Sequence, residues 1–144
     1  MIYTEMTIKA MKLACEAHHG QLDKSGLPYV LHPLHLAEQM ETEESVTAAL
    51  LHDVAEDTDY TLEDLRRMGF PGAVMDALTL LTHDPAVPYL DYVKRLKDNP
   101  IARAVKLADL THNSDMSRLP AVTEKDLERV EKYKQAITIL KQGE

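Results

Sequence analysis

Apolar positions recur at helical spacing along most of this chain, and short segments with glycine, proline or capping residues separate them. The pattern therefore predicts a chain built of helices. Residues 21–31 interrupt it and are expected to form a loop with a hairpin-like turn at Ser25-Gly26. The predicted helices are 4–19, 33–40, 43–57, a short helix capped by Thr61, 73–82, 88–98, one that starts at Asn99-Pro100 and contains Asp109, and 123–142.

The last predicted helix, 123–142, carries an apolar stripe along its length. A stripe at this spacing is typical of a helix that packs against a core. The alternative is a dimer face, which leaves a homodimer open. The stripe consists of Leu127, Val130, Tyr133 or Lys134, Ile137 and Leu140.

Candidate chemistry is concentrated in the helix 43–57, where His52 and Asp53 are adjacent. At about 100° per residue, His52, Asp53, Glu56 and Asp57 share one face and the aliphatic residues take the opposite one. Polar groups are costly to bury unless they bind something, and imidazole and carboxylate are good ligands for Mn, Fe or Zn. The face therefore indicates a divalent metal, while an ordinary solvated polar face is the alternative.

Further ligands must come from other segments. His32 precedes Pro33, so its backbone is expected to be biased away from helix, at a junction from which the side chain projects into a cleft. Downstream, Lys106, Asp109 and Asn113 recur at i, i+3 and i+7 and form one polar stripe on a mainly apolar helix. An exposed surface aspartate is the alternative interpretation of Asp109.

Taken in order, His32, His52-Asp53 and Asp109 resemble the H…HD…D signature of the HD-domain metal-dependent phosphohydrolases. From about residue 17 to residue 113, the chain is similar to the hydrolase domain of the RelA/SpoT family. The segments that carry the resemblance are Gly20-Gln21, Lys24-Ser25-Gly26, Pro28-Tyr29, His32-Pro33, residues 49–53, Glu56-Asp57-Thr58, residues 106–109 and His112-Asn113.

The resemblance implies an all-α, HD-domain helical bundle with one bound Mn²⁺ or another divalent metal. It implies removal of the 3′-pyrophosphate from guanosine tetra- or pentaphosphate, a small-molecule nucleotide substrate. By matching positions, the metal ligands would be His32, His52, Asp53 and Asp109, the residues that activate the attacking water would be Glu56 and Asp57, and the nucleotide contacts would be Lys24, Ser25 and Asn113.

The remaining histidines are interpreted differently. His112 lies one turn beyond Asp109 and could orient a ligand, as residues next to metal ligands often do. His83 occupies a predicted helix end, where a cation favours the helix dipole. His18, His19 and His35 are interpreted as structural or surface residues.

One departure from the family concerns base recognition. Family members that hydrolyse this nucleotide usually have an arginine before the Lys-Ser pair, where it packs on the guanine, and this chain has Asp23. A carboxylate cannot stack in that way and would repel phosphate. Two alternatives follow: a phosphohydrolase for another nucleotide, for example NADPH, or a non-catalytic HD domain that senses a nucleotide. Glu56 and Asp57 favour the enzyme, because a sensor needs no general base.

Length and charge limit the remaining possibilities. The 144 residues predict a single domain, 1–144, acting as a stand-alone hydrolase without a synthetase domain. A formal net charge of −8 argues against nucleic acid and anionic membranes as partners, although a small anion held through a metal is compatible with it. The single cysteine excludes an internal disulfide. Without a long apolar run or signal peptide, a cytoplasmic location is expected.

Overall fold

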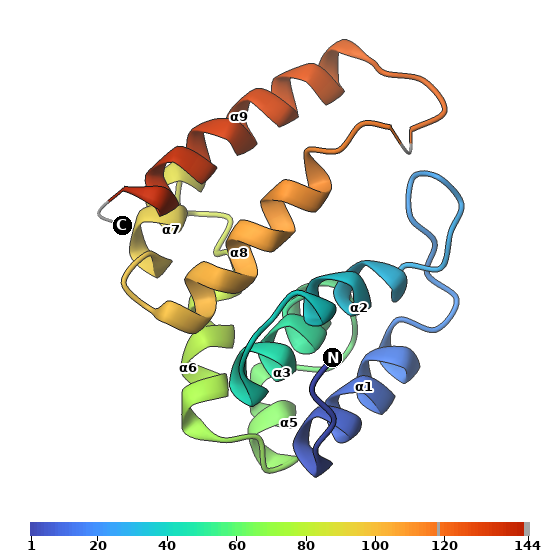
Figure 1. The fold of residues 1–144 in the computed structure, drawn as a ribbon, viewed down its shortest axis with the longest axis vertical. Coiled ribbons are helices and arrows are strands. Elements are labelled where there is room, and N and C mark those ends of the chain that lie inside the picture. The colour runs from blue at the N-terminus through green and yellow to red at the C-terminus, as the bar shows by residue number, and fades with distance from the viewer. Residues whose placement is uncertain (118, 143–144) are drawn as a thin grey trace.

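The chain forms a bundle of helices in the computed structural model, which describes residues 1–117 and 119–142 (Figure 1). Within those residues every regular element is a helix, and the extended pairing is an isolated bridge between Leu22 and Pro28. The prediction of an all-α fold is confirmed. The helices are α1 (Glu5–Ala17), α2 (Leu31–Glu38), α3 (Glu43–Leu51), α4 (Val54–Asp57), α5 (Leu62–Arg67), α6 (Gly72–Leu81), α7 (Tyr89–Leu96), α8 (Pro100–Asn113) and α9 (Glu124–Lys141).

Most helices begin where the sequence places a capping residue. At four N-termini a threonine accepts the backbone N–H of the residue three positions later, whose side chain accepts the threonine's own N–H in return. In α8, Asn99 caps the helix and Pro100 takes its first position, where no N–H is needed. The four threonine caps are Thr4, Thr42, Thr61 and Thr123.

Helix α3 forms the centre of the core. It packs against α1, α2, α6 and α8, which surround it in Figure 1. A helix that is covered on all sides must be apolar all round, and residues from Val46 through Leu51 have no exposed surface. His52 follows directly, so the chain delivers this imidazole into the interior of the bundle with 5% of its surface exposed.

The predicted continuous helix 43–57 is wrong, because the chain breaks at His52 and Asp53 into α3 and α4. The His52 Nδ1 lies 2.6 Å from the Ala49 carbonyl oxygen, which in an unbroken helix would receive the Asp53 N–H. Asp53 has φ −100° and ψ −4°, within the broad right-handed helical region, and is the N-cap residue of α4. The four ionisable groups therefore do not share one helix face.

The expected position of His32 outside a helix is also wrong, since α2 begins at Leu31 and includes it. Pro33 is the third residue of α2, and an N–H in the first turn has no partner within the helix, so proline is tolerated there. The preceding loop closes as expected. Asp23 N–H donates to the Leu27 carbonyl, and Gly26 takes φ +82°, a value that glycine adopts without strain.

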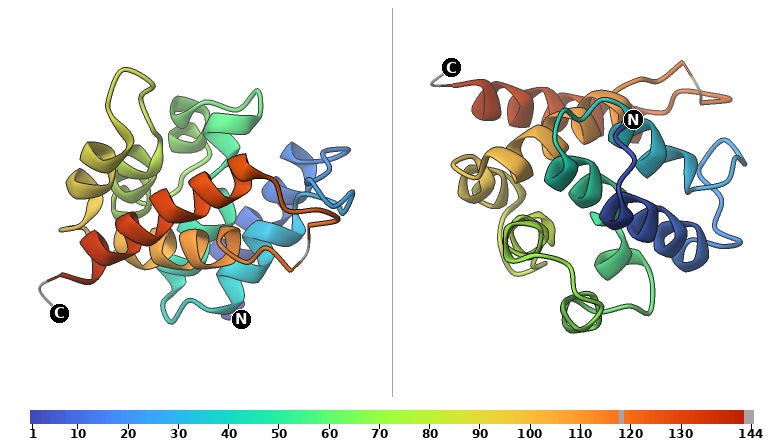
Figure 2. Two further views of the ribbon diagram at one scale, coloured as in Figure 1. Left: turned by 90° about the horizontal axis from the view of Figure 1, so that it is seen from above. Right: turned by 60° about the horizontal axis from the view of Figure 1, so that its bottom comes forward.

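Helices α8 and α9 run side by side in opposite directions, and the views in Figure 2 place the loop 21–30 and the segment 114–117 at the same end of the molecule. Along α9, Val130 and Leu140 are buried as predicted, whereas Leu127 is 54% exposed, so the assignment of Leu127 to the core is wrong. The alternative role of this helix in a dimer stays a prediction. A membrane-spanning helix is absent from the part of the chain that the structure describes.

Candidate metal centre

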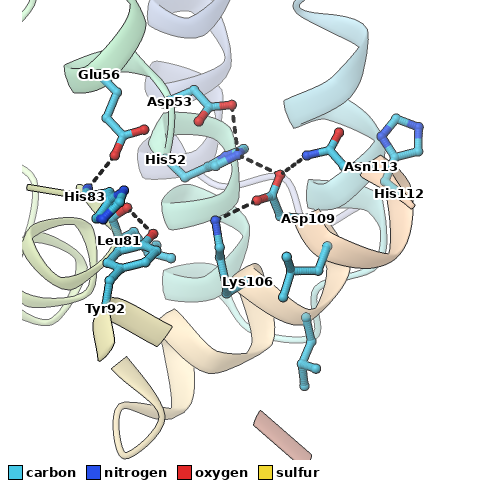
Figure 3. Close-up of polar contacts among 12 residues, drawn as sticks. His52, Asp53, Glu56, Leu81, His83, Tyr92, Lys106, Asp109, His112 and Asn113 are labelled. Atoms are coloured by element: carbon cyan, nitrogen blue, oxygen red, sulfur yellow. Dashed lines mark hydrogen bonds and ion pairs between the residues drawn. The ribbon is translucent and has the colours of Figure 1, made fainter. Parts of the chain in front are cut away.

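Three side chains from three helices converge in the interior. His32 of α2, His52 at the end of α3 and Asp109 of α8 each offer one ligand atom, and these atoms lie within 4.8 Å of one another. All three residues are buried, with 5 to 7% of their surface exposed. Figure 3 shows the His52 ring between Asp53 and Asp109. A mixed nitrogen and oxygen donor set of this size suits a divalent transition metal.

The hydrogen bonds of His52 fit a metal ligand. Its Nδ1 faces a carbonyl oxygen, which can only accept, so Nδ1 carries a proton and Nε2 is the ring nitrogen that can bind a metal once it is deprotonated. Nε2 is buried, and the Asp53 and Asp109 carboxylates lie 3.0 and 3.6 Å from it. A metal at this position would replace the Nε2 proton between the imidazole and the two carboxylates.

Asp109 is fixed by its neighbours on α8. Lys106 Nζ lies 3.0 Å from one carboxylate oxygen, and Asn113 donates to the other at 3.0 Å (Figure 3). His32 Nε2 lies 2.8 Å from that second oxygen. Burial alone would raise the pKa of Asp109, but Lys106, His32 and His52 outweigh it and hold that pKa well below its usual range. Asp109 is therefore ionised, and its interpretation as a surface residue is wrong.

Asp53 lies beside His32, His52 and Asp109 but is not part of the group whose ligand atoms all lie within 4.8 Å of one another. Its Oδ2 lies 3.0 Å from His52 Nε2 and 4.0 Å from His32 Nε2, and the Tyr29 hydroxyl donates to it at 2.5 Å. Burial opposes the ionised form of Asp53, but the adjacent His52 lowers its pKa. Burial and the Asp53 charge raise the pKa of Tyr29, so the phenol keeps its proton and donates it. Asp53 thus presents a fixed carboxylate beside the three other residues.

His112 contacts His32, one of the predicted ligands, as its position beyond Asp109 suggested. The Nδ1 atoms of His32 and His112 lie 2.7 Å apart and the two rings are stacked and nearly parallel, with 13° between their planes. One nitrogen must donate and the other accept, because two lone pairs would repel. If His32 Nε2 is to bind a metal, its Nδ1 carries the proton and His112 accepts it.

Glu56 and Asp57 lie on the short helix α4 with exposed side chains. The His83 backbone N–H donates to Glu56 at 2.5 Å (Figure 3). Partial desolvation by the surrounding protein and the negative charge of Asp53 raise the pKa of both carboxyl groups above the ordinary values. Carboxyl groups with raised pKa values beside a potential metal site are candidates for accepting and releasing protons.

The predicted nucleotide contacts lie together. Lys24, Ser25 and Asn113 line one cavity of about 330 Å³ that reaches the metal group at His32. Asp23 also lines it, but its carboxylate accepts the backbone N–H groups of Ser25 and Leu27 at 2.8 and 3.0 Å. The residue that replaces the family's arginine therefore shapes the turn of the loop 21–30.

Among the cavity residues that the sequence reasoning missed are Arg129 and Tyr133 of α9. Arg129 pairs with Asp126 at 3.0 Å, and the same carboxylate lies 3.9 Å from Lys24. Tyr133 was assigned only to an apolar stripe. The spacing of both residues, i and i+4 on one helix face, was visible in the sequence, but nothing there placed that face against the loop 21–30.

A helical bundle that joins a histidine of one helix, a His-Asp pair of a second and an aspartate of a third defines the class of HD-type hydrolase domains. No family model matches the chain. The human guanosine-3′,5′-bis(diphosphate) 3′-pyrophosphohydrolase MESH1 is 35% identical over 126 residues, which cover 77% of this chain and 69% of that protein. The Danio rerio MESH1 is 32% identical over 129 residues, covering 80% and 71%.

Two further comparisons extend this relationship. The GTP pyrophosphokinase of Streptomyces coelicolor is 38% identical over 124 residues, and the match covers 73% of this chain but only 14% of that longer protein. A solved structure, described as a metazoan ortholog of SpoT that hydrolyzes ppGpp, has the same fold, with a TM-score of 0.77 over 99% of this chain and 89% of that one, at 24% identity. The chain belongs to the MESH1 and RelA/SpoT family of HD-type hydrolases.

Proposed function

We propose that this chain is a divalent-metal-dependent phosphohydrolase that removes the 3′-pyrophosphate from guanosine tetra- or pentaphosphate, with residues 1–144 acting as one domain. The observation that carries the proposal is the exposed Glu56-Asp57 pair on α4, next to a buried His32, His52 and Asp109 group. The activity for which the MESH1 relatives are named supports the same reaction.

In this proposal His32, His52, Asp53 and Asp109 hold Mn²⁺. Support comes from the buried Nε2 of His52 and from the two carboxylates that lie 3.0 and 3.6 Å from it. When bound, the metal would act as a Lewis acid on a phosphoryl oxygen and lower the pKa of a water molecule. Lys106, Asn113 and Tyr29 each donate to a ligand carboxylate and so fix the direction of its free lone pairs.

Glu56 acts as the general base and Asp57 assists it. The water oxygen bonds to the phosphorus attached to O3′, its proton passes to a Glu56 oxygen, and the bond between phosphorus and O3′ breaks. The 3′ oxygen leaves with a proton, and pyrophosphate is released. A raised pKa suits Glu56 to both accepting and returning that proton, and its exposed side chain is free to meet the water.

The nucleotide occupies the cavity that reaches His32. Lys24 and Arg129 supply positive charge to a polyanion that an otherwise acidic protein would repel. Ser25 and Asn113 offer neutral polar groups, and the Tyr133 ring offers a flat surface for a base. The hydrogen bonds that the Asp23 carboxylate accepts hold it in the loop. Because this chain has no arginine at that position, α9 recognises the base in this proposal.

The decisive assay measures Mn²⁺-dependent product release from guanosine tetraphosphate, NADPH and simple nucleoside mono- and triphosphates. Pyrophosphate release from the first is expected. Turnover of NADPH alone would assign another substrate, and tight nucleotide binding without any turnover would identify a sensor. Metal analysis that finds no bound metal after incubation with Mn²⁺ would overturn the ligand assignment.

Three variants separate the roles. Asp53→Ala should lose both metal and turnover, because a ligand is removed. Glu56→Gln should keep the metal and lose about 10²- to 10⁴-fold in rate, the usual contribution of a general base. Glu63→Gln, on the exposed face of α5, is the matched control and should behave as the wild type.

A further inference from the structure

A segment between α6 and α7, residues 82–88, reaches across the fold to Glu56. The His83 backbone N–H donates to Glu56 Oε1 at 2.5 Å, although the two residues are 27 positions apart (Figure 3). Helix α6 ends at Leu81, and its C-cap residue, Thr82, takes an extended conformation with φ −79° and ψ 113°. The next N–H therefore leaves the hydrogen-bonding pattern of the helix and is directed to a partner outside it.

The imidazole of His83 holds this segment in place. Its Nε2 lies 2.7 Å from the Val87 carbonyl oxygen, which closes the loop on itself. The ring packs on Tyr92 of α7 with 4.5 Å between ring centres, and the Tyr92 hydroxyl donates to the Leu81 carbonyl at the end of α6. The amide that faces Glu56 is thus anchored at both ends, by α6 and by α7.

We propose that His83 is a positioning residue for the reaction: its amide fixes the Glu56 carboxylate and its ring fixes the amide. The inference rests on the proposed function, in which Glu56 is the general base. It goes beyond that function by assigning a role to a loop residue that lies outside the metal group and the nucleotide cavity. An exposed glutamate on a four-residue helix otherwise has several rotamers open to it.

The charges around Glu56 give the expected direction of the effect. Desolvation raises the pKa of Glu56, the His83 amide lowers it, Asp53 and Asp57 raise it, and Lys106 lowers it. The Tyr92 phenol also lies near, with its own pKa raised mainly by burial. Because the amide favours the ionised form, losing it should raise the pKa of Glu56 further.

His83→Pro removes the N–H itself. Proline prefers an extended residue before it, and Thr82 already has that conformation. We expect the acid limb of the pH dependence of kcat/KM to move up by about one pH unit, since a hydrogen bond to a charged group is of that size. We expect kcat to fall about tenfold through misplacement of the base, with KM and Mn²⁺ affinity within about twofold of wild type.

Two side-chain variants test the anchor. His83→Ala keeps the N–H but loses the ring, so it should give a smaller shift of the acid limb in the same direction. His83→Gln retains a donor for the Val87 carbonyl and should restore most of the wild-type profile. A purely structural role would lower the melting temperature in all variants without moving the pH profile.

A measurement on the metal-free protein needs no turnover. The His83 amide proton, followed by NMR during a pH titration, should shift with the ionisation of Glu56, and Glu56→Gln should abolish that shift while Glu63→Gln leaves it intact. A His83 amide that does not follow Glu56, or a folded His83→Pro protein with the wild-type pH profile, would overturn the inference. Full turnover by Glu56→Gln would instead overturn the proposed function, so the two failures are distinguishable.

Discussion

The buried pair of Lys106 and Asp109 should stabilise the metal-free fold by a measurable amount. Nζ and Oδ2 are 3.0 Å apart, and only 13% and 9% of the two side chains are exposed. Lys106→Met keeps an apolar stem against the rings of Tyr89 and Tyr92, over which Nζ lies at 5.7 and 5.3 Å. It leaves a buried carboxylate without its cation, which typically costs 3–5 kcal/mol.

Lys106→Met should lower the free energy of unfolding by about 3 kcal/mol, at the low end of that range, because Asn113 and His32 still contact Asp109. Urea unfolding in the presence of a chelator measures it in wild type, Lys106→Met, Asp109→Asn and the double variant. We expect a coupling energy of about 2 kcal/mol and a change within about 0.5 kcal/mol for the exposed control Lys134→Met. If Lys106→Met lowers the free energy of unfolding as much in the Asp109→Asn background as in the wild type, the pair of Lys106 and Asp109 is not the source of the effect.

Two further predictions concern protons and the loop. In the metal-free protein burial would lower the pKa of His52, but Asp53 and Asp109 raise it well above the usual range, so metal binding must displace a proton. Mn²⁺ affinity should therefore increase from pH 6 to pH 8, with proton release visible by calorimetry in two buffers; an affinity independent of pH would contradict this. Asp23→Asn keeps an oxygen for the Ser25 and Leu27 N–H groups and removes a negative charge from the cavity, so KM should fall about fivefold. Asp23→Ala loses the turn and should raise KM, and equal KM values for both variants would refute the role of the loop hydrogen bonds.

Local sequence signals located most of the helices because their causes are local. A threonine or asparagine cap followed by a suitable third residue fixes a helix start without help from the rest of the chain. The break after Leu51 escaped the same reasoning, since Ala and Leu favour helix through residues 48–51. It depends on the ring of His52 reaching the Ala49 carbonyl, and helix propensities do not describe that contact.

The candidate site likewise has some features that local sequence signals reveal and others that depend on tertiary contacts. The ligand and base positions follow from ordered motifs, and the Lys106, Asp109 and Asn113 stripe follows from helical spacing, with the burial of Asp109 left open. The contribution of α9 to the cavity depends on its packing along α8 and on the loop 21–30 meeting it, contacts between segments about 100 residues apart in sequence. The anchoring of Glu56 by His83 is likewise a tertiary contact without a periodic signal.

The break between α3 and α4 explains how five residues supply two kinds of carboxylate. His52 and Asp53 end a helix that is covered on all sides, so their side chains are 5% and 15% exposed and the pKa of Asp53 is lowered by His52. Glu56, one turn later on a separate short helix, is exposed and has a raised pKa. An unbroken helix would have given these groups similar surroundings. The change of direction separates a carboxylate that favours its ionised form, the proposed ligand, from one whose raised pKa suits the proposed base, a division that fits metal-dependent hydrolysis.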